Sequence, residues 1–241
     1  MYLKKIIYKR DEVPSVEKYP FSIPAVRTLE ELELNTPITF FVGENGAGKS
    51  TLLEAIANVA GFNSAGGGRQ HSFSIHADEV PLAPFIRLSW TKKIYEGFFL
   101  RAESFYQFAS FIDSIEDPRK YSRYGDKSLH EASHGESFMR LFQHAFNKKA
   151  IYFLDEPEAA LSPIRQLSLL RIMKELEPTA QFVIATHSPI LLGYPGATIF
   201  NFDETAITPT TFEETDHYQV TKLFLENPNR MFRELFQDLD T

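Results

Sequence analysis

The sequence predicts a three-layer α/β fold with a mostly parallel central sheet and an inserted helical lobe. Four short apolar runs are typical of strands that are buried on both faces. They lie at 38–42, 151–154, 182–185 and 198–202. A helix is expected at 161–176, and strands that alternate with helices indicate a parallel sheet. From the chain length we expect one domain over 1–241, with the helical lobe at 102–149.

The residues between the first two runs predict the remaining elements of the first half of the chain. A helix is expected at Ser50–Ala60, and the four glycines at 61–72 favour a loop. Two further runs, at 85–90 and 94–100, lie on either side of Lys92 and Lys93. Their composition predicts two strands, and their spacing predicts that they pair as a hairpin.

The predicted lobe contains apolar residues at helical spacing. Phe105, Phe108, Ile112 and Ile115 recur at intervals of three and four, so they share one helix face that we expect to pack in the core. A polar stretch that begins at Asp117 and Pro118 divides the segment. The lobe is therefore predicted to contain two helical parts.

Composition and charge favour a globular protein without selecting a partner. The net charge is −7, but residues 203–241 hold nine acidic and three basic side chains, so the rest is nearly neutral and neither supports nor excludes nucleic-acid binding. The absence of cysteine rules out disulfides and thiolate metal sites. No stretch approaches about 18 consecutive apolar residues, and the charged start does not resemble a signal peptide. We expect a cytoplasmic protein without a membrane span.

A glycine-rich motif follows the first predicted strand and opens the first predicted helix. The motif has the pattern G-x-x-x-x-G-K-[ST] and consists of Gly43, Glu44, Asn45, Gly46, Ala47, Gly48, Lys49 and Ser50, with Thr51 next in the helix. Its peptide N–H groups and the helix N-terminus would surround phosphate oxygens, Lys49 would neutralise phosphate charge, and Ser50 would bind Mg²⁺. A chance glycine-rich turn is the alternative. The pattern predicts a P-loop NTPase that binds ATP and Mg²⁺.

Two carboxylates follow the strand at 151–154. Asp155 and Glu156 would stand where a buried strand opens into a polar cleft. There Asp155 could reach Mg²⁺, and Glu156 could position the attacking water. Asp155 could instead cap a helix before Pro157, but the upstream phosphate loop favours the catalytic interpretation.

A histidine follows the strand at 182–185. A lone histidine is more often structural than catalytic, but the end of a strand in a doubly wound sheet is where ligands bind. We therefore expect the His187 imidazole to reach a γ-phosphate.

Together these motifs resemble the ATP-binding-cassette superfamily over most of residues 36–190, and within it the soluble SMC-like and RecF-like ATPases and small predicted ABC-type ATPases. The ordered set is the phosphate loop, a signature-like segment at 133–137, the Asp-Glu strand, a D-loop-like segment at 160–163 and His187 as switch histidine. The resemblance implies that Ser133 and Gly135 meet the γ-phosphate bound by an opposite subunit. ATP would then hold a homodimer together. A capping box of Ser133 with Glu136 explains the same residues without a ligand.

Two family features have no clear counterpart. No glutamine falls where the family carries its Mg²⁺-sensing residue, and Arg101, Glu103 and Gln107 are the nearby polar candidates. The aromatic residue that stacks on adenine in transporter cassettes could be Tyr19 or Phe21, or both could be core residues.

The predicted activity is ATP hydrolysis that switches the state of a partner, either a nucleic-acid-related or a defence or repair component. The alternatives are the ATP-binding subunit of a membrane transporter and a nucleotide-binding module with little turnover. Beyond His187 the acidic residues at 203–216 are expected to form a solvated face, Asp203 included. Apolar residues at helical spacing in 218–239 are expected to pack on the core or on a partner.

Overall fold

Six strands form the central sheet of the computed structural model, which describes residues 1–64, 66–69, 81–131, 133–147 and 149–236. Across the sheet they are β5 (Gly97–Arg101), β6 (Ile151–Asp155), β7 (Gln181–Ala185), β3 (Ile38–Val42), β8 (Thr198–Asn201) and β9 (Thr208–Thr210). The first five are parallel, and β9 runs antiparallel to β8. Every residue of β3, β6 and β7 is buried, as expected for strands covered on both faces. The predicted mostly parallel sheet is confirmed.

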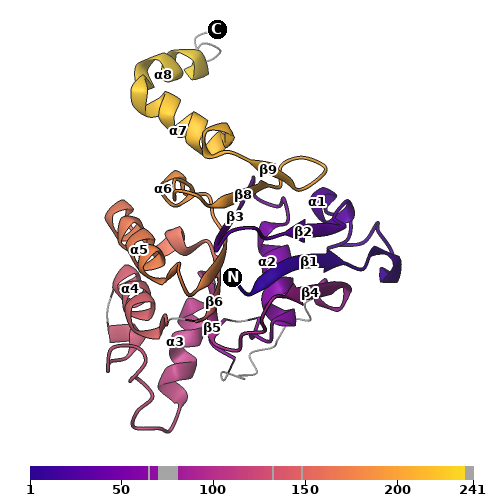
Figure 1. Ribbon diagram of the computed structural model, residues 1–241. Helices are drawn as coiled ribbons and strands as arrows, with labels where there is room; N and C mark the ends of the chain where they lie inside the picture. Colours follow the sequence, from indigo (N-terminus) through magenta and orange to yellow (C-terminus); the bar gives the residue numbers. More distant parts are fainter. Residues whose placement is uncertain (65, 70–80, 132, 148, 237–241) are drawn as a thin grey trace.

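Helices cover both faces of this sheet and produce three layers (Figure 1). Phe40 and Tyr152 point into one core, which they share with side chains of α3 (Phe105–Ser114), α4 (His134–Ala145) and α5 (Pro163–Leu176). Their neighbours Phe41 and Phe153 point into the other core, which α2 (Lys49–Val59) covers. Adjacent residues of a strand face opposite sides, so each strand contributes to both cores.

A second sheet of three antiparallel strands lies on the α2 side. Its order is β2 (Glu31–Glu33), β1 (Leu3–Tyr8) and β4 (Ile86–Trp90), and the short helix α1 (Pro24–Arg27) packs beside it. The predicted hairpin is therefore wrong, since β4 pairs with β1 whereas β5 pairs with β6. The reason is burial: Phe98, Phe99 and Leu100 are all buried and need cover on both faces, while β4 stays partly exposed.

The segment between β5 and β6 is helical in two parts, as predicted. Phe105, Phe108 and Ile112 of α3 are buried, and Ile115 packs against the same core, so the core interpretation of this stripe is confirmed. Residues 65 and 70–72 of the loop expected at 61–72 lie outside the described residues; Gly67 bridges to Phe99. Among the described residues the longest helix, α5, has 14 residues, and no helix is long and apolar enough to cross a membrane.

The chain ends in two helices that extend away from the sheet (Figure 1). After α6 (Pro189–Leu192), β8 and β9 come α7 (Asp216–Glu226) and α8 (Pro228–Phe236). Neither helix buries a side chain. Their exposed large apolar residues are Val220, Leu223, Phe224, Leu225, Phe232, Leu235 and Phe236. The expectation that these residues pack on the core is wrong, and packing on a partner stays a prediction.

Candidate active site

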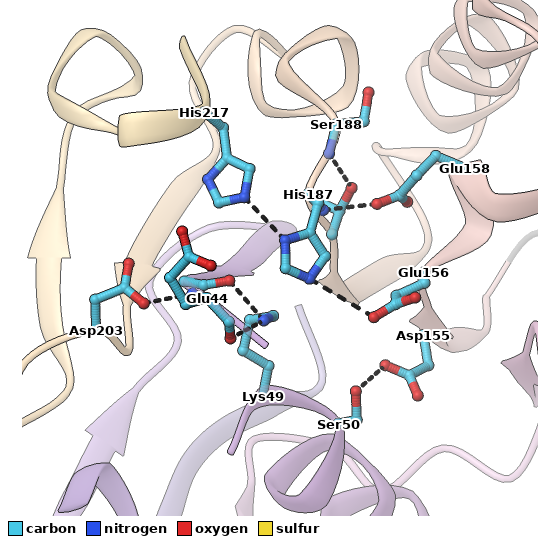
Figure 2. Close-up of polar contacts among 12 residues, drawn as sticks. Glu44, Lys49, Ser50, Asp155, Glu156, Glu158, His187, Ser188, Asp203 and His217 are labelled. Carbon is cyan, nitrogen blue, oxygen red and sulfur yellow. Dashed lines mark hydrogen bonds and ion pairs between the residues drawn. The ribbon is translucent and has the colours of Figure 1, made fainter. Parts of the chain in front are cut away.

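Three adjacent strands carry the predicted site residues to one edge of the sheet. β3 leads into the loop at 43–48, β6 ends at Asp155, and β7 leads to His187. Parallel strands present their carboxyl ends at the same edge, where α/β proteins bind ligands. Figure 2 shows Lys49, Asp155, Glu156 and His187 gathered there from three separate segments.

The glycine-rich loop turns directly into α2. Gly48 precedes the helix with φ of 102°, a left-handed conformation that favours glycine, and a Cβ there would lie 2.9 Å from Ile23 Cγ2. Lys49 Nζ donates hydrogen bonds of 2.6 and 2.8 Å to the carbonyl oxygens of Gly43 and Glu44. Burial lowers the pKa of Lys49, and the carboxylates of Glu156, Asp203, Asp155 and Glu44 oppose that shift. The loop thus holds a buried cation beside a helix N-terminus, which suits phosphate.

Ser50 and Asp155 form the candidate magnesium site. The Ser50 hydroxyl donates a 2.7 Å hydrogen bond to Asp155 Oδ1 (Figure 2). Burial raises the pKa of Asp155 to about 6, with the Ser50 hydrogen bond opposing the shift. A buried carboxylate beside a hydroxyl suits Mg²⁺, which takes few protein ligands and completes its shell with phosphate oxygens and water. The described residues contain no group of three or more His, Asp or Glu side chains arranged for a metal ion.

Glu156 occupies the turn after β6. Its backbone is left-handed, with φ of 48° and ψ of 51°, an arrangement that non-glycine residues adopt rarely and mostly at functional sites. Its peptide N–H donates a 2.9 Å hydrogen bond to the Ala185 carbonyl oxygen, which ties the turn to β7. The side chain is 42% exposed, and its Oε1 lies 3.6 Å from His187 Nε2. The hydrogen-bonded turn therefore holds the Glu156 backbone in place, while its carboxylate remains accessible to water.

Two residues that the sequence did not assign hold His187 from two directions. The His187 peptide N–H donates a 2.6 Å hydrogen bond to Glu158 Oε1, and its ring Nδ1 lies 2.9 Å from His217 Nε2. Burial lowers the pKa of the His187 imidazole, and the positive charge of Lys49 lowers it further. Glu158 belongs to the Asp-Glu-Pro-Glu sequence at 155–158, so its proximity to the predicted catalytic carboxylates could have been noticed from the sequence. His217 lies in α7, and no sequence motif indicates that it contacts His187.

Asp203 also contacts the site. Its carboxylate accepts a hydrogen bond from the Glu44 peptide N–H in the phosphate loop (Figure 2). The side chain is exposed, as predicted for the acidic face, but it is not purely solvated. It therefore adds a negative charge beside the loop that the sequence did not indicate.

Ser133 and Gly135 are not brought to the phosphate loop of their own chain. They begin α4, on the opposite face of the sheet from α2, and Ser133 forms the capping box with Glu136. A Cβ on Gly135 would lie 2.7 Å from the Ala160 carbonyl oxygen and 2.3 Å from Arg165 Nη1, so only glycine fits beside the D-loop-like segment. Their contact with a nucleotide on another subunit stays a prediction.

Arg101 is one of the polar candidates for the position where the family carries a glutamine. It ends β5 opposite Asp155 in register, and its guanidinium lies 3.3 Å from both Glu54 and Glu103 carboxylates. Gln107 is exposed on α3 and does not reach inward. Arg101 therefore places a cation, paired with two acids, beside Asp155 at the end of β5.

The two aromatic candidates for the adenine contact differ in burial. Phe21 is 5% exposed and packs edge-on against Phe85 with ring centroids 5.0 Å apart, so it is a core residue. Tyr19 is 71% exposed, and its hydroxyl lies 3.4 Å from Thr51 Oγ1 in the first turn of α2. Of the two, Tyr19 is available for a base beside the phosphate loop.

Protein comparisons place these features among ATPases. Residues 22–137 match the family described as "AAA domain", and residues 128–193 match the family described as "AAA domain, putative AbiEii toxin, Type IV TA system". The phosphate import ATP-binding protein PstB 1 of Vibrio parahaemolyticus is 26% identical over 200 residues, which cover 72% of this chain and 74% of that protein. Its counterpart in Vibrio cholerae is 25% identical over 200 residues, covering 72% and 73%.

Solved structures share the fold. A nucleotide-free ATP-binding cassette from an ABC transporter superposes with a TM-score of 0.52 at 15% identity, covering 88% of this chain and 92% of that one. CbiO1 from Clostridium perfringens, part of the ABC transporter complex cbiONQ, gives 0.50 at 19% identity, covering 95% and 97%. The family matches, the PstB relatives and the ordered motifs support an ATPase of the ATP-binding-cassette superfamily, and the solved structures share its fold.

Proposed function

We propose that this ATPase hydrolyses Mg²⁺-ATP with Lys49 and the loop N–H groups on the phosphates, Glu156 positioning water and His187 contacting the γ-phosphate. The observation that carries the proposal is the convergence of these side chains at one sheet edge, with Ser50 2.7 Å from Asp155 and His187 3.6 Å from Glu156. Ser50 and Asp155 would hold Mg²⁺, which supplies charge neutralisation when bound. Tyr19 would contact the adenine.

We further propose that ATP joins two copies of the chain. Ser133 is exposed at the N-terminus of a 12-residue helix. Its hydroxyl oxygen accepts a hydrogen bond within the capping box, but its O–H can still donate to a phosphate on another subunit, which the helix dipole would also attract. Hydrolysis would remove the γ-phosphate that this contact needs. The output is then opening of the dimer, a conformational signal to a partner.

For the partner, a nucleic-acid-related or defence or repair component is the first proposal. It is supported by the match of residues 128–193 to a family whose description names a toxin system. The lack of a glutamine at the place where the family carries its Mg²⁺-sensing residue also departs from transporter cassettes. A transporter subunit is the second candidate, supported by the PstB relatives. Co-purification with a membrane protein would favour the transporter, and ATP binding without turnover would favour a nucleotide-binding module.

Replacing Lys49 with alanine tests the phosphate site. We expect ATP affinity to fall about 30- to 100-fold, because charge-assisted hydrogen bonds to phosphate contribute roughly 2–3 kcal/mol. Affinity would be measured by calorimetry with Mg²⁺-ATP. Lys92→Ala, at an exposed lysine away from the sheet edge, is the matched control and should bind normally. Unchanged affinity in Lys49→Ala would contradict the phosphate-loop assignment.

A further inference from the structure

A histidine from the C-terminal extension reaches into the candidate active site. His217 lies in the first turn of α7, which begins after the buried residue Thr215, whose hydroxyl accepts the Tyr218 peptide N–H. The His217 ring is tilted against that of His187, with centroids 5.0 Å apart, and His217 Nε2 lies 2.9 Å from His187 Nδ1. In Figure 2 the His187 ring stands between His217 and Glu156.

A hydrogen bond between two neutral imidazoles has only two arrangements, because each ring carries one proton. In the first, His217 donates from Nε2 to Nδ1 of His187, so the proton of His187 is on its Nε2. In the second, His187 donates from Nδ1, and its Nε2 is a bare lone pair. The proton positions are assigned from the surroundings, and these favour the first arrangement.

The carboxylate of Glu156 is the first of those surroundings. Its Oε1 lies 3.6 Å from His187 Nε2. An N–H at this nitrogen is attracted to the carboxylate, whereas a lone pair is repelled by it. The same N–H is what a γ-phosphate oxygen would require of His187, since phosphate oxygens only accept hydrogen bonds.

The second feature of the surroundings that favours the first arrangement is the environment of His217 Nδ1, the ring nitrogen that does not face His187. His217 Nδ1 is buried and has no hydrogen-bond partner among the described residues. His187 Nε2 is likewise buried without a hydrogen-bond partner among the described residues, but it faces the Glu156 carboxylate 3.6 Å away. The first arrangement therefore places the buried proton beside a negative charge, whereas the second places it on His217 Nδ1, away from that carboxylate. Unpaired buried N–H groups are rare because they lose their hydrogen bonds to water. Burial and the positive charge of Lys49 also lower the pKa of His187, which favours its neutral form.

We propose that His217 is a positioning residue that donates from Nε2 to His187 Nδ1 and fixes His187 in the tautomer whose Nε2–H faces Glu156 and the γ-phosphate. This inference rests on the proposed role of His187. The Glu158 carboxylate accepts the peptide N–H of His187 and so holds the His187 backbone. His217 holds the His187 ring. Because His217 belongs to α7, a displacement of the C-terminal helices would alter the tautomer of His187.

Two substitutions of similar size separate hydrogen bonding from packing. In His217→Leu the donor is lost, and we expect kcat to fall about tenfold with KM for ATP within about twofold, as for other residues that orient a functional histidine. In His217→Gln the amide can donate to Nδ1, so kcat should recover to within about threefold of wild type. His144→Leu, at an exposed histidine of α4, is the matched control and should not change turnover.

The tautomer itself is measured by ¹⁵N NMR of histidine-labelled protein, with the His187 signals identified by their loss in His187→Ala. We expect protonated Nε2 in wild type and in His217→Gln, and a mixture in His217→Leu. A wild-type tautomer and unchanged kcat in His217→Leu would overturn the inference alone, provided that His187→Ala lowers kcat. Full turnover in His187→Ala would instead overturn the proposed role of His187.

Discussion

Replacing Glu156 with glutamine is expected to lower ATP turnover about 10³-fold while ATP affinity stays within about threefold, the range that loss of a general base produces. Glutamine has the shape of glutamate, and the turn is held by the Glu156 peptide N–H on Ala185, which the substitution leaves intact. Only the negative oxygen that faces water and His187 is removed. Geometry should therefore survive while activation of water is lost.

The same variant should accumulate the ATP-bound dimer. Light scattering with Mg²⁺-ATP is expected to give twice the monomer mass for Glu156→Gln, and the monomer mass without nucleotide. Glu175→Gln is the matched control, because Glu175 is exposed and, in the described part of the chain, pairs only with Arg171, 3.1 Å away on the same helix. Normal turnover in Glu156→Gln would move the catalytic role elsewhere. A monomer with ATP bound would leave Ser133 as a helix cap only.

The central sheet was predictable because its strands are short runs that are apolar throughout. Residues 38–42 and 151–155 are buried on both faces, and runs that are apolar throughout are typical of strands inside a parallel sheet. Strand pairing was less predictable. β4 and β5 are neighbours in sequence, yet β4 pairs with β1, some 80 residues earlier. Local composition does not record which distant strand is the partner.

The site residues, like the strands, were predictable only in part. Asp155 and His187 lie at or just after the ends of predicted strands, and Lys49 follows such a strand through the loop 43–48, so the topology gathers all three at one edge. His217 follows no strand: it depends on where β9 and the 212–214 turn deliver α7, which no motif encodes. The apolar pattern of α7 and α8 predicted helices correctly, but not that these helices would leave the core, because an apolar stripe is the same on a core helix and on a docking helix.

Asp155→Asn is expected to stabilise the nucleotide-free protein by about 2–3 kcal/mol near neutral pH and to abolish its Mg²⁺-dependent stabilisation by ATP. The carboxylate of Asp155 is buried, and burial raises its pKa from the usual 3.8 to about 6. Asparagine has the same shape, carries no charge and can still accept the Ser50 hydroxyl. Asp155, the residue that best suits Mg²⁺, therefore destabilises the folded protein when no Mg²⁺ is bound.

The raised pKa of Asp155 determines how the stability difference between Asp155→Asn and the wild type should vary with pH. An acid whose pKa is higher in the folded than in the unfolded state binds its proton more tightly when folded, so stability is lost as pH rises through the window from 3.8 to about 6. Urea unfolding in EDTA should show Asp155→Asn more stable by a constant amount above about pH 6, with the difference vanishing near pH 4. Asp11→Asn, at an exposed aspartate, should change the free energy of unfolding by less than about 0.5 kcal/mol. A destabilised Asp155→Asn, or a difference independent of pH, would mean that other contacts stabilise the ionised carboxylate, and would remove the physical reason for expecting Mg²⁺ there.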